Sequence, residues 1–372
     1  MKLKELGTIV TGNTPSKQSV ENWDSPDIGF VKPDIISDTG ISIIDDAAEY
    51  ISEKARAKAR IVGENSILIT CIGSIGKIGI TAKGTFAFNQ QINAIIPNRK
   101  VNSKYLAYAL LYAKPRLVAI ANAPVVPIIN KSQFGDFEIK VTENTEYQSK
   151  AVEVLDTVNA IIENRRQQLQ KLDELVKARF VEMFGDPVTN PMDWPTKPLL
   201  EMGYCKNGMN FHTGDSGIEM HCLGVGDFKD YSVIDGTDYL PTISLNEAPP
   251  EESMLQDGDL VFVRSNGNKA LVGRCLLVYP HNTPTTYSGF CIRYRLTSAE
   301  VNIAYLLRVL KTDSMRKKMA GRGANIQNLN QQILAALNIP TPPLELQEWF
   351  TAFIEQIDKS KAVEGLYSSL CL

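Results

Sequence analysis

The residues best suited to chemistry lie in a glycine-rich turn within the stretch ILITCIGSIGKIGI, residues 67–80. A phosphate-binding P-loop would need Gly where Cys71 stands and Ser or Thr where Ile78 follows Lys77, because that hydroxyl holds the magnesium ion. The flanks alternate like strands, and no long helical pattern follows to supply a helix N-terminus for an anion. The stretch therefore predicts a hairpin with a polar tip, formed by Ser74 and Lys77.

Two further segments resemble parts of other catalytic sites. Asp34, in a Pro-Asp pair, and the later EIK segment at residues 138–140 suggest a nuclease, whose metal ions need clustered carboxylates. The matching place in the second half of the chain reads NIP at residues 338–340, so both segments are interpreted as strand ends. The NPMD segment from Asn190 differs from an adenine methyltransferase tetrapeptide in its last two residues, and no glycine-rich cofactor loop accompanies it. No catalytic centre and no cofactor site are predicted.

The cysteines do not form a recognisable framework. Six are scattered at positions 71, 205, 222, 275, 291 and 371, and in a chain of this size they are expected to be reduced thiols. A zinc site would have to combine Cys205, His212, His221 and Cys222, whose spacing fits no common finger or ribbon. No metal site is predicted.

The polar and basic residues that remain are concentrated in turns, where they could contact DNA. Lys and Arg neutralise phosphates, whereas Asn, Gln, Ser and Arg read base edges in the major groove. Each segment alone is also typical of an ordinary turn or a solvated face. In the first half the candidate DNA-binding residues are Asn13, Thr14, Ser16, Lys17, Lys32, Lys54, Arg56, Lys58, Arg60, Ser74, Lys77, Asn89, Gln90 and Gln91. In the second half they are Arg264, Ser265, Asn266, Asn268, Lys269 and Arg274.

The elements that position these residues are written twice in the chain. LKELG at residues 3–7 returns as LLEMG at 199–203, and the hairpin stretch returns from residue 258 to residue 275. The offset stays at roughly 193 to 200 residues throughout. Each unit is far longer than a solenoid repeat, so the sequence predicts two copies of one domain. The polar tips differ between the copies, which favours two domains that recognise different short sequences.

A long helix is predicted at the end of each copy. The first should run from about residue 148 to 184, roughly 55 Å, and stop at the GDP of 185–187. The second should run from about residue 344 to 370, with Gly365 inside its pattern. A 3-4-3-4 seam predicts an antiparallel coiled coil with a globular domain at either end. The seam residues are Leu155, Val158, Ile162, Leu169, Leu172, Val176 and Met183, with Phe350, Phe353 and Ile357.

Such a seam is usually a structural spacer only. Here a rod that fixes the distance between two similar domains would let a protein read two separated sites on one polymer.

The composition fits a globular chain of two or three domains. It has 372 residues, of which 44% are hydrophobic and 22% charged. The formal net charge of -3 gives no global basic field, so nucleic-acid binding would have to come from local patches. No apolar run approaches the roughly 18 residues of a membrane helix, and the first residues contain no signal-peptide pattern. A cytoplasmic location is expected.

Several segments together carry a family resemblance. They are GNTPS at residues 12–16, NQQINAIIP at 89–97, ARFVEMFGDP at 178–187, IPTPPLELQ at 339–347 and IDKSK at 357–361. Over nearly its whole length the chain resembles the specificity subunit of Type I restriction-modification enzymes. The second copy departs from the pattern near NTPS and NQQ, where it has KNGMNFHTGD and SGFCIRY.

The resemblance implies a mixed α/β fold with two target recognition domains, at residues 1–143 and 187–341. These alternate with two conserved spacer helices, at residues 144–186 and 342–372. It also implies a non-catalytic subunit that binds a bipartite sequence in double-stranded DNA and docks two methyltransferase subunits and the restriction subunits. Methylation by S-adenosylmethionine would occur in those partners, so no cofactor is expected here. The alternatives are a duplicated scaffold that does not bind DNA, or an enzyme that uses the residues set aside above.

Overall fold

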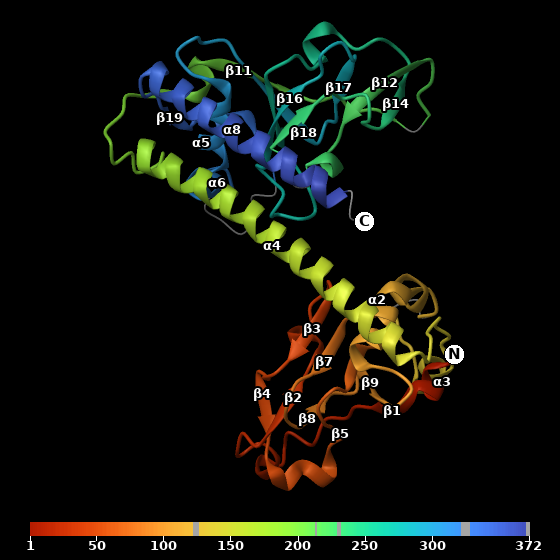
Figure 1. Cartoon of the computed structure of the whole chain (residues 1–372). Coiled ribbons are helices and arrows are strands. Elements are labelled where there is room, and N and C mark those ends of the chain that lie inside the picture. Colours follow the sequence, from red (N-terminus) through yellow and green to blue (C-terminus); the bar gives the residue numbers. More distant parts are fainter. Residues whose placement is uncertain (122–125, 213, 229–231, 321–327, 370–372) are drawn as a thin grey trace. The chain divides into compact units, whose positions relative to one another are not determined.

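The computed structural model describes residues 1–121, 126–212, 214–228, 232–320 and 328–369 (Figure 1). The chain divides into two compact units, Met1–Glu163 and Asn164–Leu372. Helix α4 (Thr145–Phe184) is continuous through the division. No helix of the described segments combines the length and the apolar character needed to cross a membrane.

Unit 1 is a mixed α/β unit with two sheets. The first has the order β1 (Gly7–Thr11), β9 (Ile92–Pro97), β6 (Ile67–Thr70), β7 (Ile78–Thr81) and β3 (Ile41–Ile44). The second has the order β4 (Glu49–Ile51), β2 (Ile28–Val31), β8 (Phe86–Phe88) and β5 (Ile61–Val62). The helices are α1 (Leu3–Leu6), α2 (Ser103–Ala119) and α3 (Lys131–Asp136), with short 3-10 turns η1 (Val20–Asn22), η2 (Pro33–Ile35) and η3 (Glu53–Lys58).

The glycine-rich stretch of residues 67–80 forms the predicted hairpin. Strands β6 and β7 pair antiparallel, with Ile67 opposite Ile80, and both strands are fully buried. Gly73 and Gly76 adopt φ of 76° and 79°, a region open mainly to glycine, which explains why the turn needs them. Helix α2 packs its apolar face against this sheet through Leu106, Ala107, Leu110, Ala113 and Leu117.

Unit 2 is also mixed α/β. Its main sheet has the order β11 (Gly203–Asn207), β18 (Cys291–Leu296), β15 (Asp259–Val263), β16 (Cys275–Tyr279) and β13 (Val233–Asp235). The smaller sheets are β14 (Thr242–Leu245), β12 (Ile218–Leu223) and β17 (Thr285–Tyr287), and β10 (Thr196–Pro198) with β19 (Asn338–Pro340). The helices are α5 (Ile303–Lys311), α6 (Asp313–Ala320), α7 (Gln331–Ala335) and α8 (Leu344–Ser369), with 3-10 turns η4 (Leu199–Glu201), η5 (Val225–Asp227) and η6 (Glu251–Ser253).

The main sheets of the two units share one strand order, and the second sheets share three strands. In the main sheets β1, β9, β6, β7 and β3 correspond in order to β11, β18, β15, β16 and β13. The directions agree as well, since β3 and β13 are each parallel to their neighbour and the other pairs are antiparallel. In the second sheets β2 lies between an antiparallel β4 and a parallel β8, as β12 lies between β14 and β17. The duplication read from the sequence is therefore present in the strand order.

A buried glutamine repeats at the start of each long helix. The Gln148 Oε1 accepts the Asn102 N–H at 2.7 Å, and its Nε2 donates to the carbonyls of Lys100 and Thr142 at 2.9 and 2.7 Å. Gln347 binds Asn302, Glu300 and Pro342 in the same way, at 2.8, 3.1 and 2.7 Å. Both side chains are fully buried. Each glutamine therefore ties a long helix to the N-terminus of the helix that covers its own sheet.

Replacement of Gln148 by alanine should destabilise the chain by about 1–3 kcal/mol, because a buried side chain and its three hydrogen bonds to the backbone would be lost. Gln347→Ala should have a similar effect. The measurement is chemical denaturation of each variant beside Gln167→Ala, an exposed glutamine on the same helix. Equal stability of all three variants would contradict this role.

Helices α4 and α8 pack against each other within unit 2. The ring centroids of Phe180 and Phe184 lie 5.6 and 5.4 Å from that of Phe350. The Arg179 guanidinium carbon lies 4.7 Å from the Trp349 ring centroid. Further along, an ion pair of 2.5 Å joins Asp173 of α4 to Lys361 of α8. Residue numbers decrease along α4 as those of the contacting residues increase along α8, so the two segments are antiparallel here.

The seam residues are buried to different degrees. Val176 and Phe350 are buried, whereas Met183, Phe353 and Ile357 are partly buried against the same core. Leu155 is exposed, and Val158, Ile162, Leu169 and Leu172 are intermediate. Phe180 and Phe184, which the sequence pattern missed, are more buried than most of the predicted seam. The first helix begins at Thr145, three residues before the predicted start.

Candidate nucleic-acid interface

Five of the candidate residues of unit 1 meet where two loops run side by side. The Gly12 N–H donates to the Ile92 carbonyl at 3.0 Å, and the Asn13 N–H donates to the Phe88 carbonyl at 3.0 Å. A Cβ on Gly12 would lie 2.1 Å from the Asn89 carbonyl oxygen, so only glycine permits this approach. The pairing brings together what we call the first tip: Asn13, Thr14, Asn89, Gln90 and Gln91.

The residues of the first tip divide into supporting and exposed groups. Asn89 is buried, its Nδ2 donates to Gln91 Oε1 at 2.8 Å, and its Oδ1 accepts the Gln91 N–H at 3.1 Å. Asn13 donates to the Lys58 carbonyl at 2.7 Å. Thr14 and Gln90 are exposed and hydrogen-bonded to each other at 2.8 Å. A hydroxyl and an amide held together at the surface suit the reading of a base edge.

Two candidate lysines outside the first tip, Lys17 and Lys32, share one carboxylate. Lys17 lies 3.5 Å from Glu49 and 5.4 Å from the centre of the Trp23 ring. Lys32 also pairs with Glu49, and its hydrogen bond lowers the pKa of that carboxyl. The Ser16 carbonyl accepts the Trp23 indole N–H at 3.2 Å.

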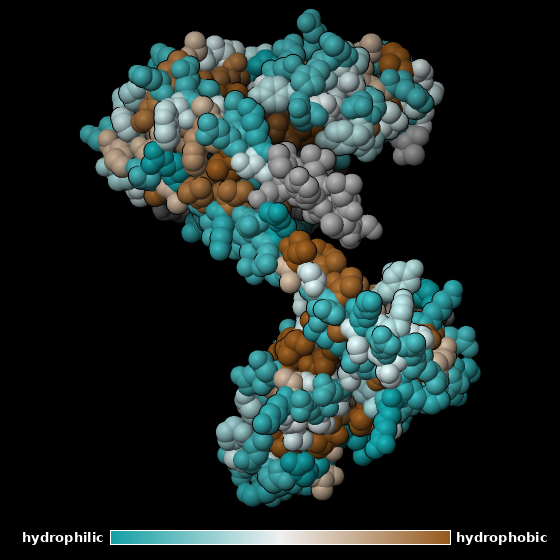
Figure 2. Space-filling view, viewed as in Figure 1, coloured by the Kyte–Doolittle hydropathy of each residue, from teal (hydrophilic) through white to brown (hydrophobic). Residues whose placement is uncertain are grey.

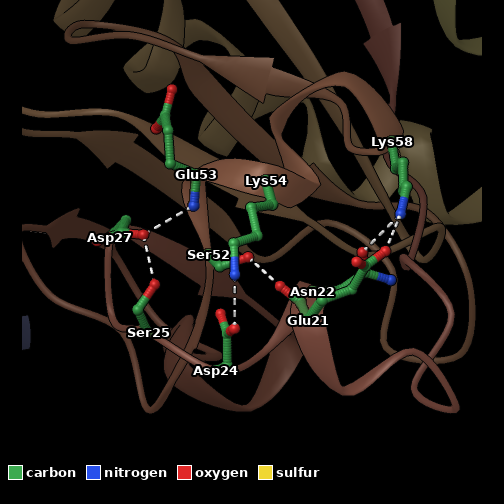
Figure 3. Close-up of polar contacts among 9 residues, drawn as sticks. All are labelled: Glu21, Asn22, Asp24, Ser25, Asp27, Ser52, Glu53, Lys54 and Lys58. Carbon is green, nitrogen blue, oxygen red and sulfur yellow. Dashed lines mark hydrogen bonds and ion pairs between the residues drawn. The ribbon is translucent and has the colours of Figure 1, made fainter.

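The cations of η3 are also engaged by carboxylates (Figure 3). Lys54 pairs with Asp24 at 3.0 Å, and Lys58 pairs with Glu21 at 2.9 Å, a hydrogen bond that lowers the pKa of Glu21. Arg56 pairs with the neighbouring Glu53. DNA phosphates would have to compete with these carboxylates, so the run supplies less positive potential than its sequence indicates. Arg60 is exposed and takes part in none of the ion pairs found among the described residues.

The hairpin tip of unit 1 is less open than its sequence indicates. The Lys77 side chain is only 13% exposed, and its ammonium lies 3.1 Å from Asp38. Ser74 is exposed in the turn between the strands. A phosphate contact by Lys77 would require release of the Asp38 pair, whereas Ser74 is accessible as it stands.

Unit 2 repeats the two-loop arrangement. The Gly208 N–H donates to the Cys291 carbonyl at 3.1 Å, and the Met209 N–H donates to the Tyr287 carbonyl at 3.0 Å. A Cβ on Gly208 would lie 2.0 Å from the Ser288 carbonyl oxygen. The end of β15 joins this pair of loops, since the Arg264 N–H donates to the Phe290 carbonyl at 2.8 Å. We call these loops and the adjoining hairpin the second tip.

Two of the predicted residues of unit 2, Ser265 and Asn266, line a hollow in the second tip. Its volume is about 400 Å³, and it is lined by Val225, Ser265, Asn266, Gly267, Phe290 and Asn328. The Arg264 guanidinium donates to the Gly289 carbonyl at 3.3 Å. Asn266 and Asn268 accept backbone N–H groups two residues ahead, which shapes the hairpin turn. Lys269 is exposed, whereas Arg274 donates to the Phe228 carbonyl at 3.5 Å.

Comparison with known proteins identifies the family. The family model for the Type I restriction modification DNA specificity domain matches residues 1–174 and 247–366, which is most of the chain. The chain belongs to this family. The resemblance read from the sequence is thereby confirmed.

Relatives and solved structures agree with the family. The chain is 29% identical over 229 residues to the Type I restriction enzyme MjaIX specificity subunit of Methanocaldococcus jannaschii, covering 56% of this chain and 52% of that one. It is 28% identical over 186 residues to the EcoR124I/EcoR124II specificity subunit of Escherichia coli, covering 48% and 45%. The matches thus span about half the length of these relatives.

Two solved chains share the fold. The S subunit of a Type I restriction-modification system from M. genitalium has a TM-score of 0.51 and 14% identity, covering 100% of this chain and 94% of that one. A chain solved in work on complex assembly and conformational transition of the type I R-M system has a TM-score of 0.56 and 15% identity, covering 100% and 93%.

Three polar or aromatic residues of the second tip were not predicted from the sequence. They are Asn210 beside Gly289, Asn328 at the hollow, and Phe290, whose side chain is 61% exposed. A phenylalanine before a strand is ordinarily interpreted as a core residue. The repeat had placed the SGFCIRY segment near the position of NQQ, but Phe290 was not among the predicted contact residues.

The described part of this family member contains no group of three or more His, Cys, Asp or Glu residues placed to hold a metal ion. Burial raises the pKa of the Cys205 and Cys222 thiols to about 12, which disfavours the thiolate that zinc requires.

Proposed function

We propose that this chain is the DNA specificity subunit of a Type I restriction-modification complex, with one half-site of a bipartite DNA sequence read by each unit. The observation that carries the proposal is the repetition of one two-loop tip at equivalent strands of both units, on a shared topology but with different side chains. A duplicated scaffold that does not bind DNA gives no reason for the side chains of the two tips to differ while the strand order around them is the same.

The chemistry of the tips suits the major groove. Thr14 and Gln90 present a hydroxyl and an amide, and the second tip presents Arg264 and Asn266 beside its hollow. These groups read base edges, while lysines nearby contact phosphates. Under this proposal the chain itself neither methylates nor cleaves DNA and needs no cofactor, and it acts in the cytoplasm.

The long helices are proposed to set the distance between the half-sites. Helix α4 has 40 residues, about 60 Å at 1.5 Å per residue. Each end is fixed, since Asp156 binds Lys104 at 2.7 Å and Tyr108 at 2.6 Å, whereas Phe184 lies in the core of unit 2. We infer that the antiparallel pairing with α8 continues as a coiled coil and relates the recognition domains, residues 1–143 and 187–341, by a pseudo-two-fold axis. Residues 144–186 and 342–372 are then the spacers.

A second apolar stripe on α4 is a candidate docking surface for the methyltransferase subunits. Tyr147, Val154 and Ile161 follow at intervals of seven, with exposed fractions of 60%, 58% and 51%. Apolar surface on this helix is visible in Figure 2. Three large apolar side chains at heptad spacing match the seam that a partner helix presents. The restriction subunits would join through the assembled complex.

Val154→Asp should reduce co-purification of the methyltransferase subunit at least ten-fold, because a carboxylate would be buried in an apolar helix contact. The matched control is Ala160→Asp, an exposed position of the same helix outside the stripe. Affinity purification from cells that express both subunits measures the effect. Equal recovery with the two variants would remove the stripe from the docking surface.

The proposed function is tested by mapping methylated adenines in DNA from cells that express this chain with its methyltransferase partner. A two-part motif with an unread gap is expected. Methylation without any sequence preference, or a short continuous motif, would contradict bipartite recognition and favour a scaffold role.

A further inference from the structure

Phe290 occupies in the second tip the position that Gln91 occupies in the first. The Gln91 carbonyl accepts the Cys71 N–H at 2.7 Å, and the Phe290 carbonyl accepts the Arg264 N–H at 2.8 Å. Gln91 donates its N–H to the Asn89 side chain at 3.1 Å, and Phe290 donates to Ser288 Oγ at 3.3 Å. Equivalent backbone bonds therefore present an amide in one unit and an aromatic ring in the other.

The ring of Phe290 is held outward by a rigid turn. The Gly289 N–H donates to the Met209 carbonyl at 2.6 Å, and the Cys291 N–H donates to the Ser288 carbonyl at 2.8 Å. The Ser265 N–H adds a second bond to the Phe290 carbonyl at 3.3 Å. A backbone fixed at this many points sets the position from which the ring projects before any ligand arrives, so binding would cost little backbone entropy.

The surroundings of the ring combine apolar and amide groups. Phe290 borders the hollow of about 400 Å³, whose lining residues include Asn266 and Asn328. In the major groove an A·T pair presents a thymine methyl group beside the N6 and N7 atoms of adenine. An apolar ring next to amides is complementary to that pair, whereas G·C offers no methyl group.

We propose that Phe290 contacts the 5-methyl group of a thymine in the second half-site, with an adjacent asparagine facing the paired adenine. The inference rests on the proposed function and assigns a specificity determinant to one residue of the second tip. It also explains why the two units would recognise different DNA sequences with equivalent backbone structure, since Gln91 cannot supply the apolar contact.

The test replaces each thymine of the target with deoxyuridine, which pairs alike but lacks the methyl group. Binding of the full chain, assembled with its methyltransferase partner, is measured on each substituted duplex. One thymine of the second half-site should show about three- to five-fold weaker binding, the effect expected for one methyl group of apolar contact. Phe290→Ala should weaken binding to the unmodified duplex about ten-fold and abolish the penalty at that thymine.

Controls separate this inference from the proposed function. Tyr112→Ala, which removes a 91% exposed ring from unit 1, should bind as the unsubstituted protein does and keep the deoxyuridine penalty. Absence of any thymine effect, or a penalty that persists unchanged in Phe290→Ala, would overturn the methyl contact while leaving sequence-specific binding intact. Failure of the assembled complex to prefer any sequence would instead overturn the proposed function.

Discussion

Deletion of residues 164–170 from α4 should shorten the unread gap between the half-sites by about three base pairs. Seven residues contribute roughly 10 Å to a helix, and each base pair rises about 3.4 Å. The deletion preserves the heptad phase. It also spares the contacts of Asp156 in unit 1 and of Asp173 in unit 2. The DNA groove rotates by about a third of a turn over three base pairs, so affinity should fall even on the best new site.

Selection from a randomised DNA library by the assembled complex measures the new gap. The control keeps the helix length and replaces the exposed side chains of residues 164–170 with alanine. Recovery of both half-site sequences at the original spacing would show that α4 does not set the gap. Altered half-site sequences at unchanged spacing would place recognition in the helix itself.

Phe184→Ala should produce the largest loss of stability of any single substitution considered, about 3–5 kcal/mol. The ring is 2% exposed, and its centroid lies 4.8 Å from that of Tyr305 and 5.4 Å from that of Phe350. Its removal leaves a cavity where α4 enters unit 2. Because this joint anchors the spacer, the variant should also tolerate a wider range of gap lengths.

Chemical denaturation and library selection together measure both effects of Phe184→Ala. Val181→Ala lies one turn away and removes a 56% exposed side chain, so it should leave stability and gap length nearly unchanged. If both variants lost the same stability, the aromatic cluster would not be the anchor inferred here.

The sequence was sufficient to predict the main helices and strands, because these elements depend on local patterns of residues. Alternating apolar residues and paired glycines predicted the β6–β7 hairpin, and heptad spacing predicted α4 to within three residues at its start. The burial of Gln148 and Gln347 was not predictable, because a glutamine in a helix is ordinarily solvent-exposed. Two of the three backbone partners of Gln148, at Asn102 and Lys100, are 46 and 48 residues away in the sequence.

The interface was predicted less completely, since charge and exposure depend on tertiary neighbours. The structure brings the turn residues Asn13, Thr14 and Gln90 together, as glycines and amides that mark tight turns led us to expect. Their contact with DNA stays a prediction. The cations at Lys54 and Lys58 looked free in the sequence, yet carboxylates from distant loops pair with them. Side-chain exposure of Phe290 had no local signal at all.

The most direct test of the account maps the methylated motif for two single variants expressed with the methyltransferase partner. Gln90→Ala, in the first tip, should relax one part of the motif and leave the other part unchanged. Arg264→Ala, in the second tip, should relax only the other part, with a loss of about 1–3 kcal/mol of base discrimination. A variant that alters both parts, or two variants that alter the same part, would contradict the assignment of one half-site to each unit.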